Sequence, residues 1–304
     1  MSAFVNEQEL RPELSASVIV TTYNWPQALE CVLWGLFAQS RKDFEIVIAD
    51  DGSSVATREA IERLARHAPV RLKHVWQPDD GFNKCRILNK ALAVASGKRV
   101  IFTDGDCVVR NDFVDVHVEK AVSGRFLSGS YYKLSEHVSA AITKDAITSQ
   151  EAFSANWLIR HGVKIDAGLL KVLAKNKFAA FLDAVSTARP SWNGHSASCL
   201  RTEAIAVNGF NEEMGYGGLD VEFGLRLNSY GLKVKRIRYA ALALHLHHER
   251  PYNTPAMREV SQSVKERTRE LGLMWAEKGL DQWLLRDGIV QLPACDQVTT
   301  YEVS

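Results

Sequence analysis

The sequence lacks the charge pattern that marks nucleic-acid-binding proteins. Its 37 Lys and Arg residues are balanced by 36 Asp and Glu residues, which gives a formal net charge of +1. Proteins that bind nucleic acids usually show a strong basic excess, so we expect no nucleic-acid partner. Internal repeats and low-complexity tracts are also missing.

Long apolar runs and paired cysteines are missing as well. No run reaches the roughly 18–20 apolar residues that span a bilayer. Residues 1–10 contain no basic segment followed by an apolar one, so they do not read as a signal peptide. The five cysteines are odd in number and form no CxxC pair, which favours reduced thiols. These absences predict a cytoplasmic protein.

The composition that is present is typical of an ordinary globular protein. Apolar residues make up 46% of the chain and charged residues 24%. With 304 residues, the chain can bury a sizeable core in one large α/β domain or two small ones.

Short apolar runs alternate with helix-like segments up to residue 103. The runs at 17–22, 44–49, 70–76 and 99–103 are typical of buried strands. The segments between them, at 27–39, 56–67 and 83–96, have apolar residues at helical spacing, and Pro26 suits a first helical turn. This alternation predicts an α/β fold with a mostly parallel central sheet flanked by helices.

The later part of the chain is patterned less regularly. Residues 140–188 mix apolar and basic side chains and predict one to three helices. Residues 191–250 return to a mixed α/β pattern, and residues 255–284 predict one long charged helix. The tail after Pro293 is only weakly patterned.

Polar or acidic clusters follow three of the predicted strands, at residues 21–24, 50–54 and 104–106. Ligands of parallel sheets bind beyond the carboxyl ends of the strands. We therefore expect the three clusters to meet at one edge of the sheet.

The third cluster, Asp104-Gly105-Asp106, offers two carboxylates directly after an apolar strand. Mg²⁺ and Mn²⁺ prefer such oxygen ligands together with substrate phosphates, and Gly105 permits a close approach of backbone and ligand. The same tripeptide is also typical of a polar turn.

The other two clusters contain residue types that suit a nucleoside. A carboxylate at the end of the second strand, Asp50 or Asp51, can accept hydrogen bonds from a base or ribose. Thr21, Tyr23 and Asn24 could surround a uracil-like base. Each could instead be ordinary loop chemistry, such as an acidic loop that caps the next helix.

Several ordered motifs give the chain a family resemblance. They are SVIVTTYNWPQAL, IVIADDGS, NKCRILNKALAVASGKRVIFTDGDC and GFNEEMGYGGLDVEFGLRLNSYG. In order and spacing they resemble the inverting glycosyltransferases of family 2, over about residues 15–130 and again over 209–231. The second stretch is similar to the acceptor half of bacterial polysaccharide glycosyltransferases and of the galactosyltransferase group.

The resemblance implies a GT-A fold that uses a nucleotide-sugar donor. One GT-A domain would cover residues 1–250, with a nucleotide-sugar half at about 15–130, a helical insert at about 140–188 and an acceptor half at about 190–250. Residues 251–304 would form a C-terminal helical extension.

The resemblance also implies a donor site, here for a UDP-sugar. Its expected residues follow the predicted strands or begin the helix after residue 83, with one tryptophan further along: Thr21, Tyr23, Asn24, Asp50, Asp51, Asp80, Lys84, Arg86, Asp104, Asp106 and Trp192. Thr21, Tyr23 and Asp51 would surround the nucleoside, and Asp50 would support them.

The remaining donor-site residues would contact the rest of the nucleotide sugar. Asp80 and Lys84 would contact the nucleotide or its diphosphate, and Arg86 and Asn89 would shape the same wall. Lys84 and Arg86 could instead lie on a solvated helix face. Trp192 could stack on a sugar ring or could pack in the core.

A metal ion, Mn²⁺ or Mg²⁺, is implied at the same edge. Asp104 would face the ribose and donor sugar, Asp106 would ligate the metal, and a histidine of LALHLHHERP would complete the site. Strand alternation places His245 and His247 on one face and does not choose between them. The expected metal ligands are Asp104, Asp106, His245 and His247, although a histidine run can also be an exposed polar cluster.

Asp220 is the candidate general base. Members of the resembled family usually have two adjacent acidic residues here, the second being the base, and this chain has Leu219 at the first position. The departure puts the identity of the acceptor in doubt more than the type of reaction. Asp220 could alternatively be an acidic residue favoured by the helix dipole, and Glu222 would point elsewhere on the helix.

These expectations predict an inverting hexosyltransferase that moves a sugar from a nucleotide-diphosphate donor to a hydroxyl of a glycan or lipid-linked glycan. Surface polysaccharide biosynthesis is the expected setting. The metal would neutralise charge on the leaving nucleotide, while Asp220 takes the proton of the hydroxyl.

Two other functions compete with this prediction. A nucleotidyltransferase would normally have a glycine-rich loop after the first strand, and residues 21–26 contain no glycine. A non-catalytic carbohydrate- or membrane-binding module is the second alternative. Segment 157–182, with its basic and apolar residues, could make a peripheral membrane contact or form a lid over the acceptor.

Overall fold

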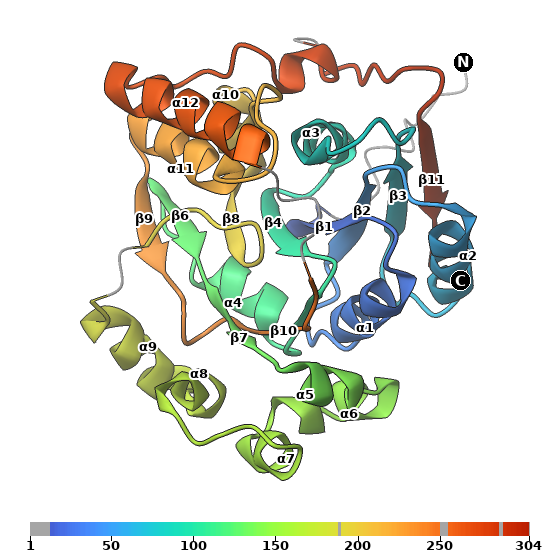
Figure 1. The fold of residues 1–304 in the computed structure, drawn as a ribbon, viewed down its shortest axis with the longest axis vertical. Helices are drawn as coiled ribbons and strands as arrows, with labels where there is room; N and C mark the ends of the chain where they lie inside the picture. The colour runs from blue at the N-terminus through green and yellow to red at the C-terminus, as the bar shows by residue number, and fades with distance from the viewer. Residues whose placement is uncertain (1–12, 188–189, 250–254, 286–287, 304) are drawn as a thin grey trace, which may run out of the picture.

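The computed structural model describes residues 13–187, 190–249, 255–285 and 288–303, and it shows a central sheet between two layers of helices (Figure 1). The first seven elements follow the predicted alternation: β1 (Ala16–Thr22), α1 (Pro26–Phe37), β2 (Phe44–Asp50), α2 (Val55–Ala65), β3 (Leu72–Trp76), α3 (Lys84–Val94) and β4 (Arg99–Asp104).

Residues 107–245 add mostly shorter elements. These are β5 (Cys107–Val109), α4 (Phe113–Glu119), β6 (Arg125–Ser128), β7 (Ser130–Lys133), β8 (Ala197–Leu200), α10 (Arg201–Ala206), α11 (Leu219–Ser229), β9 (Lys233–Arg236) and β10 (Leu242–His245). The helical insert lies between β7 and β8.

The main sheet has the strand order β11-β3-β2-β1-β4-β8-β6-β9. Its centre, β3-β2-β1-β4, is parallel, while β8 pairs antiparallel with β4 and β6. The predicted α/β architecture is confirmed, and the parallel arrangement is confined mainly to the half that the βαβ units build. A second, three-stranded sheet has the order β5-β10-β7.

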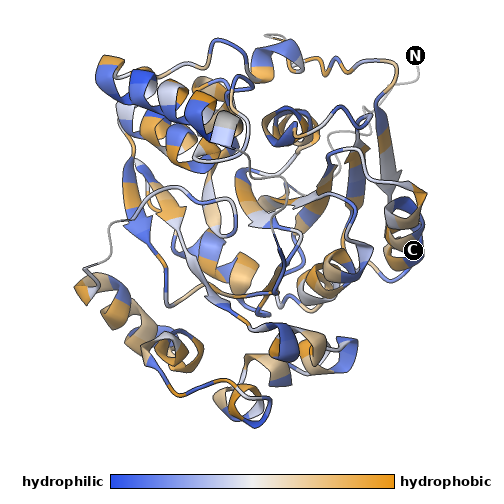
Figure 2. Ribbon diagram, in the orientation of Figure 1, coloured by the Kyte–Doolittle hydropathy of each residue, from blue (hydrophilic) through white to orange (hydrophobic). Residues whose placement is uncertain are grey.

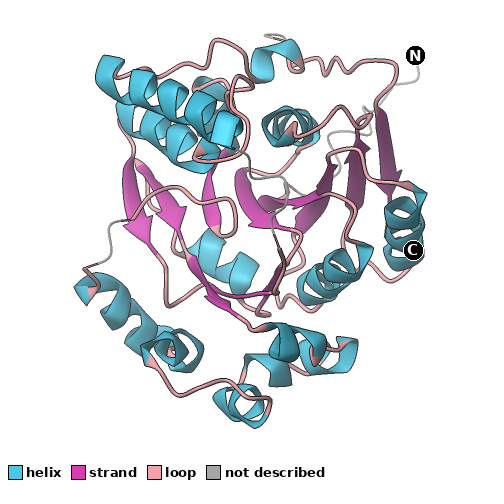
Figure 3. Ribbon diagram, viewed as in Figure 1, coloured by secondary structure: helices cyan, strands magenta, loops and turns pink. Residues whose placement is uncertain are grey.

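Helices cover both faces of the main sheet (Figure 3), and a separate hydrophobic core lies on each face. Along β1, Val18 and Val20 belong to the core under α1 and α2, whereas Ile19 belongs to the core under α3 and α11. Alternate side chains of a strand point to opposite faces, so a strand buried on both faces reads as a continuous apolar run. This explains why the central strands were recognisable in the sequence.

The prediction of one to three helices in the insert was wrong about their number. The structure has α5 (Glu136–Ala140), α6 (Lys144–Thr148), η2 (Glu151–Phe153), α7 (Ala155–Arg160), η3 (Ala167–Leu169), α8 (Leu170–Leu173) and α9 (Asn176–Val185). Side-chain caps from Ser135, Thr143 and Ser154 each start a new short helix. The caps divide an apolar stretch that periodicity alone would join.

The C-terminal region also differs from the prediction. Helix α12 (Pro255–Leu271) ends at residue 271 instead of 284, because Gly272 adopts a left-handed conformation with φ 59°. After η4 (Leu280–Gln282), the tail forms β11 (Gln297–Tyr301), which pairs antiparallel with β3. The expectation of a purely helical extension is therefore corrected, since this segment supplies an edge strand of the main sheet.

No helix within the described ranges combines the length and apolarity required to cross a membrane.

Candidate active site

The three polar strand ends meet at one edge of the sheet, as the sequence predicted. Thr21 Oγ1, at the end of β1, donates a hydrogen bond to Asp104 Oδ1 at a distance of 3.1 Å. The loops after β1 and β2 are joined by two hydrogen bonds of 2.8 Å, from Asn24 N to Ser53 Oγ and from Ser54 N to Asn24 Oδ1. Side chains far apart in sequence thus build one site.

Gly105 is required by the close packing of this edge. A Cβ atom at this position would lie 2.4 Å from the carbonyl oxygen of Thr21. Any side chain would therefore push the loop that carries Asp104 and Asp106 away from β1. The close approach that Gly105 permits in this structure is that of the β1 backbone at Thr21.

Asp51 is held by two donors at the predicted nucleoside position. Gln77 Nε2 donates to Asp51 Oδ1 at 2.6 Å, and the backbone N–H of Asn83 donates to Oδ2 at 2.9 Å. Burial raises the pKa of Asp51 to about 6, although these hydrogen bonds oppose the rise. The hydroxyl of Tyr23, a half-exposed residue, donates a hydrogen bond to Asp79 Oδ2.

Asp50 lies behind Asp51, where it supports the loop. It is fully buried, 2.9 Å from His74 Nε2, and its Oδ1 accepts the backbone N–H of Ser53. These contacts fix the turn that presents Asp51.

Lys84, in the first turn of α3, lies among the carboxylates of the site. Its Nζ is 2.6 Å from Asp104 Oδ1. Burial would lower the pKa of Lys84, but three nearby carboxylates raise it overall: Asp104, Asp220 and Asp106. In turn, burial would raise the pKa of Asp104, but Lys84 brings it down to about 2. The base candidate and the Asp-Gly-Asp pair therefore act on the same ammonium group.

Asp106, His245 and His248 form a group with the geometry of a metal site. One ligand atom from each lies within 4.8 Å of the others, and Asp106 Oδ2 is 3.6 Å from His245 Nε2 and 2.9 Å from His248 Nε2. His245 Nδ1 is 2.7 Å from Leu246 O and His248 Nδ1 is 2.8 Å from Glu249 O. A carbonyl can only accept, so both Nδ1 atoms carry the proton and both Nε2 atoms can coordinate a cation.

The expectation that His247 could be the metal ligand is corrected by this geometry. Strand β10 ends at His245, so strand alternation does not extend to the next residues. The backbone N–H of His247 donates to Ser139 Oγ, and its ring is absent from the group around Asp106. Asp104 groups with Asp106 and Cys107, but its Oδ1 is also bound by Lys84.

Two aromatic residues beside the histidines were not predicted as site residues. The ring of Tyr131, on β7, lies 4.4 Å from His195 and 4.7 Å from His245, measured between centroids. Burial lowers the pKa of His195 to about 4, so this ring is neutral at pH 7. No local pattern in the sequence marks Tyr131, because its position depends on the pairing of β7 with β10.

Asp220 lies in the first turn of α11, as predicted, with its carboxylate against Gly194. A Cβ atom on Gly194 would lie 2.9 Å from Asp220 Oδ1. Burial raises the pKa of Asp220 to about 6, Lys84 lowers it and Asp104 raises it. Among the described residues, Oδ1 is buried and has no hydrogen-bond partner. An unsatisfied buried acceptor of this kind suits a hydroxyl donor.

Helix α11 is held in place by an ion pair that points away from the site. Glu222 and Arg226 are both buried, with Nε to Oε1 at 2.8 Å, and Thr268 Oγ1 of α12 donates to Glu222. Glu222 therefore links α11 to α12, in agreement with the prediction that it points elsewhere.

The expected stacking of Trp192 on a sugar is corrected by its burial. Only 1% of Trp192 is exposed, and its ring packs against Phe102, Phe126 and Phe223. Trp192 therefore packs in the core, which is the other position that the sequence left open.

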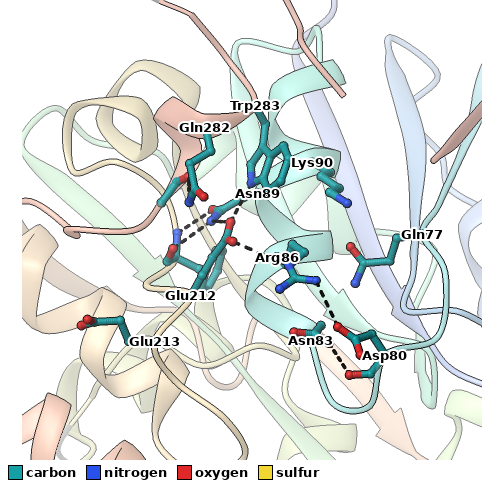
Figure 4. A network of polar contacts seen from close by, with 12 residues as sticks. Gln77, Asp80, Asn83, Arg86, Asn89, Lys90, Glu212, Glu213, Gln282 and Trp283 are labelled. Atoms are coloured by element: carbon teal, nitrogen blue, oxygen red, sulfur yellow. Dashed lines mark hydrogen bonds and ion pairs between the residues drawn. The ribbon is translucent and has the colours of Figure 1, made fainter. Parts of the chain in front are cut away.

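Arg86 and Asn89 lie on the side of α3 that faces Glu212 (Figure 4). Arg86 Nη1 is 3.9 Å from Asp80 Oδ2, and its Nε is 3.9 Å from Glu212 Oε2. Arg86 also lines a cavity of about 530 Å³ beside the C-terminal segment. Asn89 is fully buried and bonds to Phe210 and Glu212, so it is a structural link. Asp80 is largely exposed.

The fold is of the GT-A type, as its likeness to two solved structures shows. S. aureus TarS residues 1–349 in complex with UDP-GlcNAc superposes with a TM-score of 0.58 at 16% identity, covering 88% of this chain and 69% of that one. The mannosyltransferase PcManGT from Pyrobaculum calidifontis, solved with GDP-Man and Mn²⁺, gives a TM-score of 0.53 at 18% identity, covering 79% and 59%.

Sequence comparison then points to the family. Residues 17–156 match the family model described as Glycosyl transferase family 2, so the resemblance to this family is supported over that part of the chain. Chondroitin synthase of Pasteurella multocida is 27% identical over 240 residues, which covers 72% of this chain and 23% of the synthase. The chain spans between 23% and 52% of the length of the first curated relatives that it matches.

Proposed function

We propose that this chain is an inverting glycosyltransferase that moves a sugar from a UDP-sugar to a hydroxyl of a glycan or lipid-linked glycan. The observation that carries the proposal is the buried, unpartnered Oδ1 of Asp220 beside the Lys84–Asp104 pair. A base that lies next to the donor-site charges can take the proton of an attacking hydroxyl.

The environment of Asp220 suits this role. A pKa of about 6 leaves a carboxylate at pH 7 that is more basic than an ordinary aspartate. Attack from the face opposite the leaving diphosphate inverts the anomeric carbon, so an α-linked donor gives a β-linked product. No residue is needed to form a covalent sugar intermediate.

The group of Asp106, His245 and His248 fits a divalent cation, because two imidazole Nε2 atoms and one carboxylate oxygen can converge on it. Mg²⁺ usually takes oxygen ligands only, so the histidines favour Mn²⁺ as the resident metal. When bound, the metal supplies positive charge for the diphosphate leaving group. Lys84 adds a fixed ammonium at the same place.

The donor and acceptor classes are supported by the comparisons. UDP-GlcNAc and GDP-Man with Mn²⁺ are bound by the two structurally similar proteins, and a chondroitin synthase is among the relatives in sequence. A growing surface polysaccharide is therefore the acceptor that we propose.

The test is a panel of nucleotide sugars incubated with the protein in Mn²⁺ or EDTA, with release of nucleotide diphosphate as the signal. Asp220→Asn should bind donor as the wild type does and lower turnover by about a hundredfold or more. Glu222→Gln is not a suitable control, because Glu222 is buried and anchors α11. Glu213→Gln, on the preceding loop, loses only a part-exposed ion pair with Arg267 and should keep full turnover. Unchanged turnover in Asp220→Asn would remove Asp220 from the mechanism.

A further inference from the structure

Helix α9 presents its apolar side to solvent. Phe178, Phe181 and Val185 are 49%, 60% and 56% exposed and share one helix face, whereas Ala179 and Asp183 are buried on the opposite face. Asp183 Oδ1 accepts the backbone N–H of Tyr239, which holds the side of the helix with Ala179 and Asp183 inward. A surface helix of a globular protein normally has the opposite orientation.

The elements before α9 expose apolar side chains as well. Ile165 is almost uncovered, at 81% exposed, and Leu170 and Leu173 of α8 and Ile159 of α7 are also exposed. In Figure 1, α8 and α9 lie at the outer edge of the molecule, away from the main sheet, and Figure 2 shows hydrophobic residues along both. We call these seven residues the insert surface: Ile159, Ile165, Leu170, Leu173, Phe178, Phe181 and Val185. Exposed apolar side chains in this number on consecutive elements indicate an interaction site.

The charge around the insert surface is strongly one-sided. Residues 159–185 contain five basic and two acidic residues, in a chain whose net charge is only +1. Of the acidic residues Asp183 is buried, while the basic side chains include four exposed ones: Arg160, Lys164, Lys175 and Lys177. Exposed phenylalanines bordered by lysines and arginines are the pattern of a helix that lies in the interface of an anionic membrane.

The insert surface is joined to the active site by Lys171. Its Nζ donates to Ser130 Oγ at 2.9 Å and to Tyr131 O at 2.7 Å. Tyr131 in turn contacts His195 and His245 with its ring. A partner bound to α8 and α9 is therefore held at a fixed place relative to the candidate metal site.

We propose that the insert surface docks this protein on a bilayer containing anionic lipids, with Phe178 and Phe181 in the acyl boundary and the exposed basic residues on headgroups. A second copy of the chain fits less well, because two identical basic surfaces would repel each other. Docking is a property separate from sugar transfer, so either can fail while the other stands.

The experiment is flotation of the full chain with vesicles of phosphatidylcholine alone or of phosphatidylcholine mixed with phosphatidylglycerol. We expect binding only to the anionic vesicles, and weaker binding at high salt. The double variant Phe178→Ser/Phe181→Ser should lower the partition coefficient by about tenfold or more. Lys175→Gln/Lys177→Gln should lower it by about tenfold as well, since each basic residue near the surface contributes.

The matched control is Val260→Ser/Leu271→Ser, which removes two apolar residues of α12 that are equally exposed. It should float like the wild type, and circular dichroism should show that all variants are folded. Equal flotation of the wild type and the phenylalanine variant would overturn the proposal. So would a concentration-dependent dimer that the same substitutions dissociate, because the insert surface would then be a subunit interface. Release of nucleotide diphosphate from a donor in solution should be the same in all of these variants.

Discussion

The two imidazoles that face Asp106 show how a single backbone contact orients a side chain in the candidate metal site. The Nδ1–H of His248 is directed to Glu249 O, so its Nε2 points to Asp106 Oδ2 at 2.9 Å. His247 is one residue away and instead places its backbone N–H on Ser139. Adjacent histidines thus have different chemistry, although their residue type is the same.

We expect His248→Ala to weaken Mn²⁺ binding by about tenfold or more, because one of three converging ligand atoms is removed. Titration calorimetry with Mn²⁺ alone measures this directly. His247→Ala is the matched control and should bind Mn²⁺ as the wild type does. If the two variants lost affinity equally, the assignment of His248 would be wrong.

Gly194 allows a second prediction at this scale. The carboxylate of Asp220 occupies the space that a side chain on Gly194 would need, so Gly194→Ala should displace that carboxylate. A shift of about 1 Å at a reacting group can cost about a hundredfold in rate, and we expect turnover to fall by tenfold to about a hundredfold with donor affinity retained. Steady-state kinetics and donor titration separate these quantities.

Gly215→Ala is the control for this substitution. Its new Cβ would meet only Met257, at an ordinary contact distance of 3.5 Å. Turnover should be unaffected there, and a loss of similar size at both glycines would point to a general packing effect.

At the scale of elements, the C-terminal segment is attached to the donor half by one buried ion pair and one strand. Lys90 of α3 and Asp296 are 2.6 Å apart, and both side chains are almost inaccessible. The next residues form β11 on the edge of β3. Lys90 also lies over the Trp283 ring, at 4.7 Å from its centroid. The segment therefore closes one side of the domain.

Asp296→Asn should destabilise the protein by about 3 kcal/mol, because the ammonium of Lys90 stays buried without a counter-charge. The free energy of unfolding in urea at pH 7 gives the value. Glu13→Gln breaks an exposed pair with Lys98 and should cost less than about 1 kcal/mol. A cost for Asp296→Asn as small as this control would show that the buried pair is not needed.

At the scale of the whole molecule, stability should depend on a buried histidine under the sheet. His117 is fully buried, with Nδ1 2.9 Å from Ser198 Oγ, and burial lowers its pKa to about 3, with a smaller contribution from Arg99. The unfolded chain has a His pKa of about 6.5, so it binds a proton that the folded chain rejects. The stability due to neutral His117 is complete above about pH 6.5 and is lost as the pH falls toward 3.

Between pH 7 and pH 5, this one group should cost about 2 kcal/mol of unfolding free energy. His117→Gln removes the titration, so its stability should decrease by that much less than the wild type's over the same interval. Urea unfolding of both proteins at the two pH values measures the difference. Identical pH dependence of the two proteins would contradict the assignment.

The sequence alone determined the features that depend on near neighbours in the chain. Buried parallel strands read as apolar runs because both faces are covered, and Asp-Gly-Asp follows such a run, so the donor-half elements and the edge with Asp104 and Asp106 could be predicted. The sequence also predicted that Asp220 opens a helix, and it lies in the first turn of α11.

Tertiary structure decided everything that depends on distant pairing. The burial of Trp192, the ring of Tyr131 beside His245 and the end of β10 that selects His248 all follow from strands that meet across long stretches of chain. The same holds for β11, whose short β-branched run becomes a strand only because the edge of β3 is available. Local propensity is weak for short segments, and the energy that settles them comes from contacts absent from the linear pattern.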